Sequence, residues 1–133
     1  MLISLVSLMS CGNKEAESEE SAGAAWPELE SFHEVMADAY HPVADSGNME
    51  PARRLSVALE ERAATLASSI VPASAAGEET SQNLAILRDS TAGFSKAVKA
   101  GQPDSVLRPS ITYLHRIFHH LMEAGEGKME HDK

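Results

Sequence analysis

The chain of 133 residues has one cysteine, few aromatic residues and no long apolar run, and each shortage excludes a class of structure. One cysteine cannot form an intramolecular disulfide. Aromatic residues make up only 5% of the chain, so its core must be built mainly from Leu, Ala, Val, Ile and Met. This composition suits closely packed helices and suits a β-sandwich or barrel poorly. The length allows one domain.

Basic residues and catalytic motifs are also scarce. The formal net charge is −9, and the longest basic run is Arg53-Arg54, which argues against nucleic-acid binding. The sequence has no nucleophile elbow, phosphate-binding loop or paired-carboxylate arrangement, so we do not expect an enzyme. Glu30 and His33 form a Glu-x-x-His pattern once, whereas a di-iron bundle needs this pattern on two helices.

The single cysteine, Cys11, follows an uncharged and largely apolar segment, residues 1–10. This segment is far shorter than the ~20 apolar residues that span a bilayer, but it is typical of an export signal. The run Leu8-Met9-Ser10-Cys11 resembles the lipobox of bacterial lipoproteins, in which the cysteine is lipidated and becomes the mature N-terminus. No Lys or Arg precedes the run, so the signal would be shortened at its start. The alternative is a chance apolar N-terminus or the start of a buried helix.

Residues 12–25 are rich in Glu, Ser and Ala and show no apolar periodicity. Such a segment cannot bury enough surface to offset its chain entropy, so we predict a disordered, acidic tether. The predicted organisation is a signal peptide (1–10), a lipid-anchored linker (11–25), a folded domain (26–125) and a polar tail (126–133). The protein would then be attached to a membrane of the bacterial cell envelope by its lipid and would face the periplasm.

Apolar residues at three- and four-residue spacing predict four amphipathic helices. The predicted helices begin at Pro27, Pro51, Glu78 and Asp104 and end near Asn48, Pro72, Gly101 and Gly125. Pro42 is expected to end or kink the first helix, and Pro109 to kink the fourth or delay its start. Four such helices with short connections predict an all-α, up-down-up-down four-helix bundle.

Each helix has a predicted core seam. On the first helix the seam residues are Trp26, Leu29, His33, Met36 and Tyr40. On the second, the residues that face inward or along the edge are Leu55, Leu59, Arg62, Leu66 and Ile70. On the last, the seam residues are Leu107, Ile111, Leu114, Phe118 and Leu121.

Nitrogen and sulfur donors gather on the first and last helices. His33 and Met36 are one turn apart, as are His115 and His119, so each pair lies on one helix face. In an antiparallel bundle the start of the first helix lies level with the end of the last. Counting residues inward from both ends places His33 level with Phe118 and Met36 level with His115.

We therefore expect His33, Met36, His115 and His119 to converge between these two helices, with His41 within reach of His115. Imidazole suits zinc and copper, and a thioether selects Cu(I). The predicted function is binding of copper or zinc for sequestration, delivery or sensing. The alternative is that the histidines are hydrogen-bonded core residues and that the methionine fills space.

The four-helix layout, with Met36 on the first helix and histidines near the end of the last, resembles the periplasmic b-type and c-prime cytochromes. In the b-type family such positions supply the axial haem ligands, so the resemblance implies haem b held by Met36 and either His115 or His119. The Cys-x-x-Cys-His attachment motif is absent, which excludes covalent haem. A haem-binding electron carrier is therefore one alternative, and an envelope interaction protein without a ligand is another.

Overall fold

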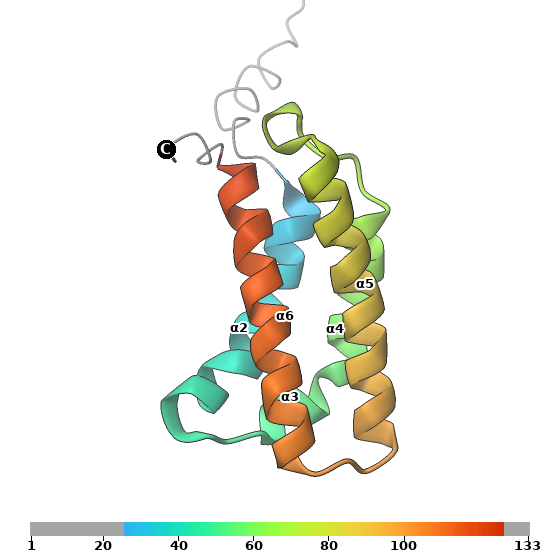
Figure 1. The fold of residues 1–133 in the computed structure, drawn as a ribbon. Helices are drawn as coiled ribbons and strands as arrows, with labels where there is room; N and C mark the ends of the chain where they lie inside the picture. The colour runs from blue at the N-terminus through green and yellow to red at the C-terminus, as the bar shows by residue number, and fades with distance from the viewer. Residues whose placement is uncertain (1–25, 127–133) are drawn as a thin grey trace, which may run out of the picture.

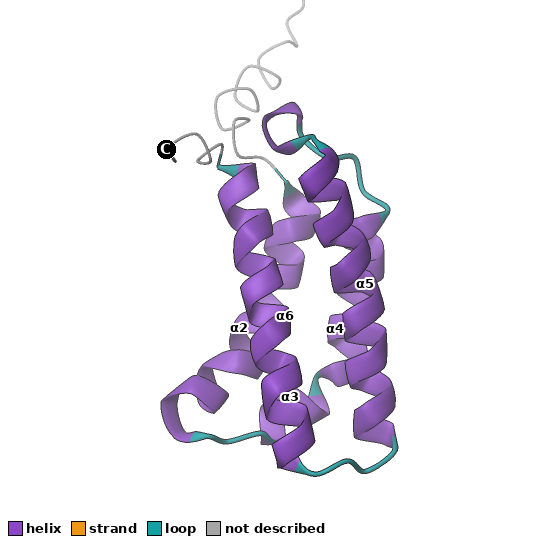
Figure 2. Ribbon diagram, in the orientation of Figure 1, coloured by secondary structure: helices purple, strands orange, loops and turns teal. Residues whose placement is uncertain are grey.

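The computed structural model describes residues 26–126, which are helical and contain no strand (Figure 2). The elements are α2 (Pro27–Ser46), α3 (Glu50–Arg54), α4 (Ser56–Ala67), the 3-10 helix η2 (Ala73–Ala75), α5 (Glu78–Lys99) and α6 (Asp104–Gly125). The all-α prediction is confirmed. The predictions for the signal segment, Cys11, the tether and the tail beyond residue 126 lie outside the described residues.

The four longer helices, α2, α4, α5 and α6, run side by side, with the short α3 at one end (Figure 1). Helix α2 packs against α4 and α6, and α5 packs against the same two helices. The start of α2 lies beside the end of α6, since a Cβ atom added to Gly125 would be 3.6 Å from the Trp26 ring. No helix within residues 26–126 combines the length and the apolar character needed to cross a membrane.

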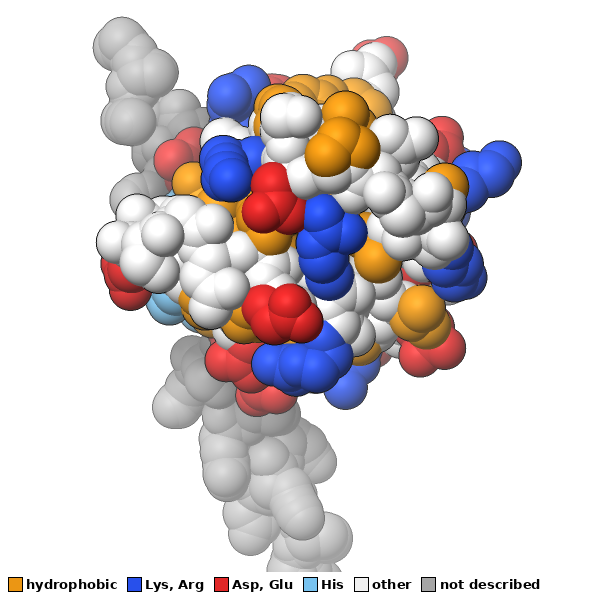
Figure 3. Space-filling view, turned by 90° about the horizontal axis from the view of Figure 1, so that it is seen from below, with side chains coloured by type: hydrophobic (Ala, Val, Ile, Leu, Met, Phe, Trp, Pro, Cys, Tyr) orange, Lys and Arg blue, Asp and Glu red, His pale blue; other side chains and the backbone are white. Residues whose placement is uncertain are grey.

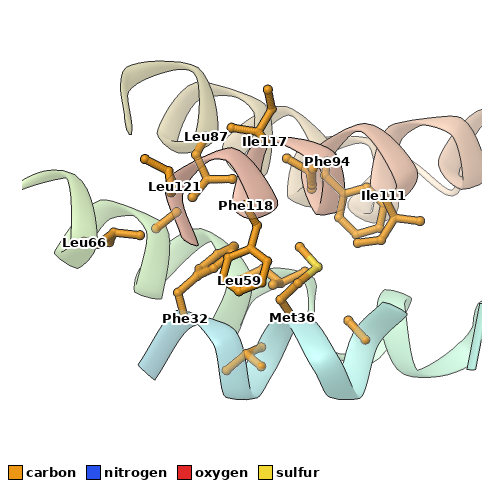
Figure 4. Packing of buried hydrophobic residues seen from close by; sticks show 14 of the residues in the cluster. Phe32, Met36, Leu59, Leu66, Leu87, Phe94, Ile111, Ile117, Phe118 and Leu121 are labelled. Carbon is orange, nitrogen blue, oxygen red and sulfur yellow. The ribbon is translucent and has the colours of Figure 1, made fainter. Parts of the chain in front are cut away.

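All four longer helices contribute side chains to one hydrophobic core (Figure 4). The five residues predicted for the seam of the last helix are all buried in α6. On α2 the buried stripe is Leu29, Phe32, Val35, Met36, Ala39 and Val43. Two of the predicted seam residues, His33 and Tyr40, are only half-buried. An apolar helix face is wider than a two-position seam, and these two residues lie at its edge.

Helix α2 continues through Pro42 and ends at Ser46. Its last turns bend away from the other helices (Figure 1), as expected where a proline removes a backbone hydrogen bond. Gly47 stops the helix in the left-handed region at φ +72°. Its N–H donates to the Val43 carbonyl at 2.9 Å, and the Asn48 N–H donates to the Pro42 carbonyl at 3.1 Å. These two bonds satisfy carbonyls that a helix end otherwise leaves unpaired.

The second predicted helix is divided and shorter than expected. It breaks at Leu55 into α3 and α4, and α4 ends at Ala67. The hydroxyls of Ser68 and Ser69 donate to helix carbonyls at 3.0 and 2.7 Å, an alternative to continued helix hydrogen bonding. Ile70, predicted to face inward or along the edge, is 91% exposed, so that prediction was wrong.

The last two helices follow the prediction closely. Helix α5 covers Glu78–Lys99, and α6 begins at Asp104 without the delay expected from Pro109. Arg53 of α3 donates to the Asp104 carboxylate at 2.6 Å and to the Gln102 carbonyl at 3.0 Å. This contact ties the start of α6 to the end of the molecule at which α3 lies.

One core position carries a polar atom without a partner. The Ser95 hydroxyl on α5 is buried and makes no hydrogen bond within residues 26–126. Removing a buried hydroxyl that lacks a partner removes its desolvation cost, so Ser95→Ala should raise the free energy of unfolding by ~1 kcal/mol. Chemical denaturation monitored by circular dichroism measures this change.

Ser90→Ala is the matched control, because Ser90 is half-buried in the middle of the same helix. The change in the free energy of unfolding of Ser90→Ala measures the gain in helix propensity alone. An equal gain from both variants would show that the Ser95 hydroxyl carries no penalty.

Candidate functional site

Aromatic rings of α2 and α6 stack along the boundary between the two helices. The His33 ring lies on Phe118 with centroids 5.1 Å apart and an interplanar angle of 28°. The Tyr40 ring lies on His115 at 4.0 Å and 15°. His33 therefore meets Phe118 as the helix register predicts, and His115 stacks on Tyr40, one helical turn beyond Met36.

His115 and His119 approach each other on α6. Their Nε2 atoms lie 3.3 Å apart, a distance at which one ring donates a hydrogen bond to the other. The rings are nearly perpendicular, at 84°, with centroids 4.5 Å apart. Two Zn–N bonds of ~2.05 Å at a tetrahedral angle also separate their nitrogens by about 3.3 Å. The pair thus has the separation that two imidazole ligands of one tetrahedral ion require.

His115 is surrounded by other histidines. Its burial lowers its pKa below the ordinary value of 6.5, and the nearby His119, His41 and His33 lower that pKa further. A lowered pKa keeps the His115 ring neutral at neutral pH. Because only a neutral imidazole coordinates a metal ion, this environment favours coordination.

Met36 is placed differently from the four histidines. Its side chain is fully buried in the core. Figure 4 shows its sulfur directed inward, on the side of α2 that faces Phe94 and Ile111. A ligand role for Met36, in an ion site or in a haem site, would require this part of the core to open.

In the described residues, His115 and His119 supply two nitrogen donors whose Nε2 atoms lie 3.3 Å apart. Within residues 26–126, no group of three or more His, Cys, Asp or Glu side chains is arranged to hold a metal ion. His33 is half-buried against the Phe118 ring, and His41 is exposed.

The predicted site did not include Tyr40 as a neighbour of His115. Tyr40 is seven residues, or about two helical turns, beyond His33, so it lies on the same side of α2 as His33, and like His33 it is outside the buried stripe. Counting residues along the two helices placed the contact with His115 correctly to within one helical turn. It did not distinguish Met36, which points into the core, from Tyr40, which lies at the boundary with α6. The presence of an aromatic residue at the edge of the apolar stripe of α2 is the sequence signal that would have predicted this stacking contact.

A comparison with known proteins found no protein-family model, no curated protein and no solved structure that matches this chain.

The lowered pKa of His115 has a consequence for stability. Between the folded pKa and 6.5 the unfolded chain binds more protons than the folded protein, so the free energy of unfolding should fall as pH drops below 6.5. His115→Phe keeps a ring against Tyr40 but cannot be protonated, so its stability should depend less on pH. Urea denaturation at several values between about pH 5 and 8 measures the slope.

His120→Phe is the control, because His120 is not among the groups that lower the pKa of His115. In this variant, the free energy of unfolding should depend on pH as steeply as in the parent protein. Equal slopes in His115→Phe and the parent protein would contradict the assigned environment.

Proposed function

We propose that this protein binds a transition-metal ion, copper or zinc, between α2 and α6. The observation that carries the proposal is the 3.3 Å separation of the Nε2 atoms of His115 and His119. It matches the distance of about 3.3 Å expected between two nitrogens of a tetrahedral zinc site. The stacked Tyr40 ring at 4.0 Å holds His115 in this orientation.

The third ligand is His33 or His41, the two further histidines that act on the pKa of His115. With the thioether of Met36 buried in the core, the available donors are imidazole nitrogens. Imidazole suits Zn(II) and Cu(II), whereas Cu(I) prefers softer sulfur ligands. The site is therefore proposed to select a borderline divalent ion.

The exposure of the site suits a cargo ion better than a structural one. His119 and His41 are both exposed, and the pair leaves coordination positions open. Structural zinc sites have four protein ligands and are closed, whereas open sites exchange their remaining ligands. Sequestration, delivery or sensing of the ion follows from this arrangement.

The proposed location is the periplasmic side of a bacterial membrane. Lipid on Cys11 would provide the anchor, and residues 12–25 would be the acidic spacer before α2. We also propose that α2, α4, α5 and α6 form an up-down-up-down bundle, supported by the packing of α2 and α5 against both α4 and α6.

Metal binding should raise thermal stability. An ion that binds only the folded state stabilises it by ~2.7 kcal/mol at a hundredfold excess over its dissociation constant. Scanning calorimetry with Zn(II) or Cu(II) should show a higher Tm for the parent protein and no increase for His115→Ala or His119→Ala. The increase should shrink below about pH 6, because protonated histidines do not bind metal.

His120→Ala is the matched control, because it removes an exposed histidine of α6 that lies outside the pair. The metal-induced increase in Tm should survive in this variant. An unchanged Tm with both ions, or loss of the increase in His120→Ala, would refute the site. A visible haem absorption band in protein purified with haem supplied would instead favour the cytochrome-like alternative.

Lipidation is tested separately on Cys11. In a bacterial host, the parent protein should fractionate with membranes, and Cys11→Ala should appear in the soluble fraction or remain unprocessed. Two or more acyl chains hold a protein on a membrane, whereas one gives only marginal binding. Mass spectrometry should show a mature chain that begins at Cys11 and carries acyl groups.

Ser18→Ala, a substitution within the spacer, should leave both the fractionation and the mass increment of the lipid unchanged. Recovery of unmodified chain with Met1 intact in the soluble cytoplasm would rule out the anchor.

A further inference from the structure

A cavity of about 480 Å³ lies where α5 begins and α6 ends, between η2, the first turn of α5 and the last turns of α6. This is the upper end of the molecule in Figure 1. Its polar lining residues are Ser74, Glu78, Glu79, Thr80, Asn83, His120 and Glu123. Consecutive helix residues point about 100° apart, so His120 lines this cavity while the neighbouring His119 meets His115.

Negative charge dominates the cavity. Its lining includes the carboxylates of Glu78, Glu79 and Glu123 and no Lys or Arg. The last turn of α6 has no basic residue to offset the partial negative charge of the helix end. The positive end of α5 is already offset by Glu78 and Glu79 in its first turn. At the opposite end of the molecule, by contrast, Lys and Arg side chains are interspersed with acidic ones (Figure 3).

The Thr80 side chain in the lining makes no hydrogen bond within the described residues. Thr80 is only 5% exposed and lines the cavity. Its hydroxyl is not fully buried, and an N–H group of a molecule bound in the cavity can donate a hydrogen bond to it. The half-buried amide of Asn83 offers a further polar contact in the same lining.

We propose that this cavity binds a linear aliphatic polyamine. Three acidic residues line the cavity, and several positive charges carried by one molecule would pair with them. Ammonium groups spaced along an alkyl chain meet this requirement. The lining also contains Ala75, Ala76 and Ala124, against which methylene groups can pack. The volume lies within the range of roughly 300–1,000 Å³ that is usual for small-molecule sites.

Calorimetric titration of the full chain with spermidine tests the proposal. The buffer has low ionic strength and contains a chelator, so that metal at the His115–His119 pair does not contribute. Spermidine should bind saturably at one site. Glu79→Gln and Glu123→Gln should each raise Kd about fivefold by removing an ion pair. Thr80→Val, which keeps the side-chain shape, should raise Kd about fivefold by removing a hydrogen bond.

Glu61→Gln is the matched control, because Glu61 is an exposed carboxylate on α4 outside the cavity lining. Its Kd for spermidine should equal that of the parent protein. In the same assay, 1,5-diaminopentane should bind more tightly than 1-aminopentane, since only the diamine carries two charges. Absence of saturable binding, or equal weakening by Glu61→Gln, would overturn the proposal. Saturable Ca²⁺ binding without chelator that is lost in Glu123→Gln would also overturn it, in favour of an ion site.

Discussion

The packing of α2 against α6 is the contact on which the candidate site depends, because the stacked rings come from these two helices. These helices lie at the two ends of the described chain, and their contact brings α6 back against the first helix, beside which α4 also packs. Tyr40 on His115 and His33 on Phe118 lie along the same boundary. Contacts between distant parts of a chain form only after the loop-closure entropy has been overcome, so the histidine pair acquires its neighbours only in the folded protein. Metal binding at this boundary would therefore be linked to folding itself.

The sequence was sufficient to predict three of the four longer helices, α2, α5 and α6, and the level at which the first and last helices face each other. Prolines near the starts of α2 and α6 and Gly47 at the end of α2 mark boundaries by backbone chemistry that is independent of tertiary structure. The contact between His33 and Phe118 followed from counting residues along two antiparallel helices. Such counts work because the rise per residue of a helix is constant.

The sequence was not sufficient to predict which residues of α2 point directly inward. Phe32 and Ala39 are buried there, while Tyr40 remains at the edge, because the width of a buried stripe depends on how closely its neighbours pack. The end of α4 was missed for another reason. Two successive serines donate to helix carbonyls and stop the helix before Ile70, although the apolar spacing continues to that residue.

Trp26, the only tryptophan, is the first described residue and stands between α2 and the segment that carries Cys11. It is buried, and its indole N–H donates to the Ser69 hydroxyl at 3.0 Å. A pulling force on the N-terminal segment would reach the fold first at this residue. Its release would break the bond to Ser69 and bring the indole into water, with a change in fluorescence. The fluorescence of Trp26 would therefore report whether the first residue of the folded domain is docked or released.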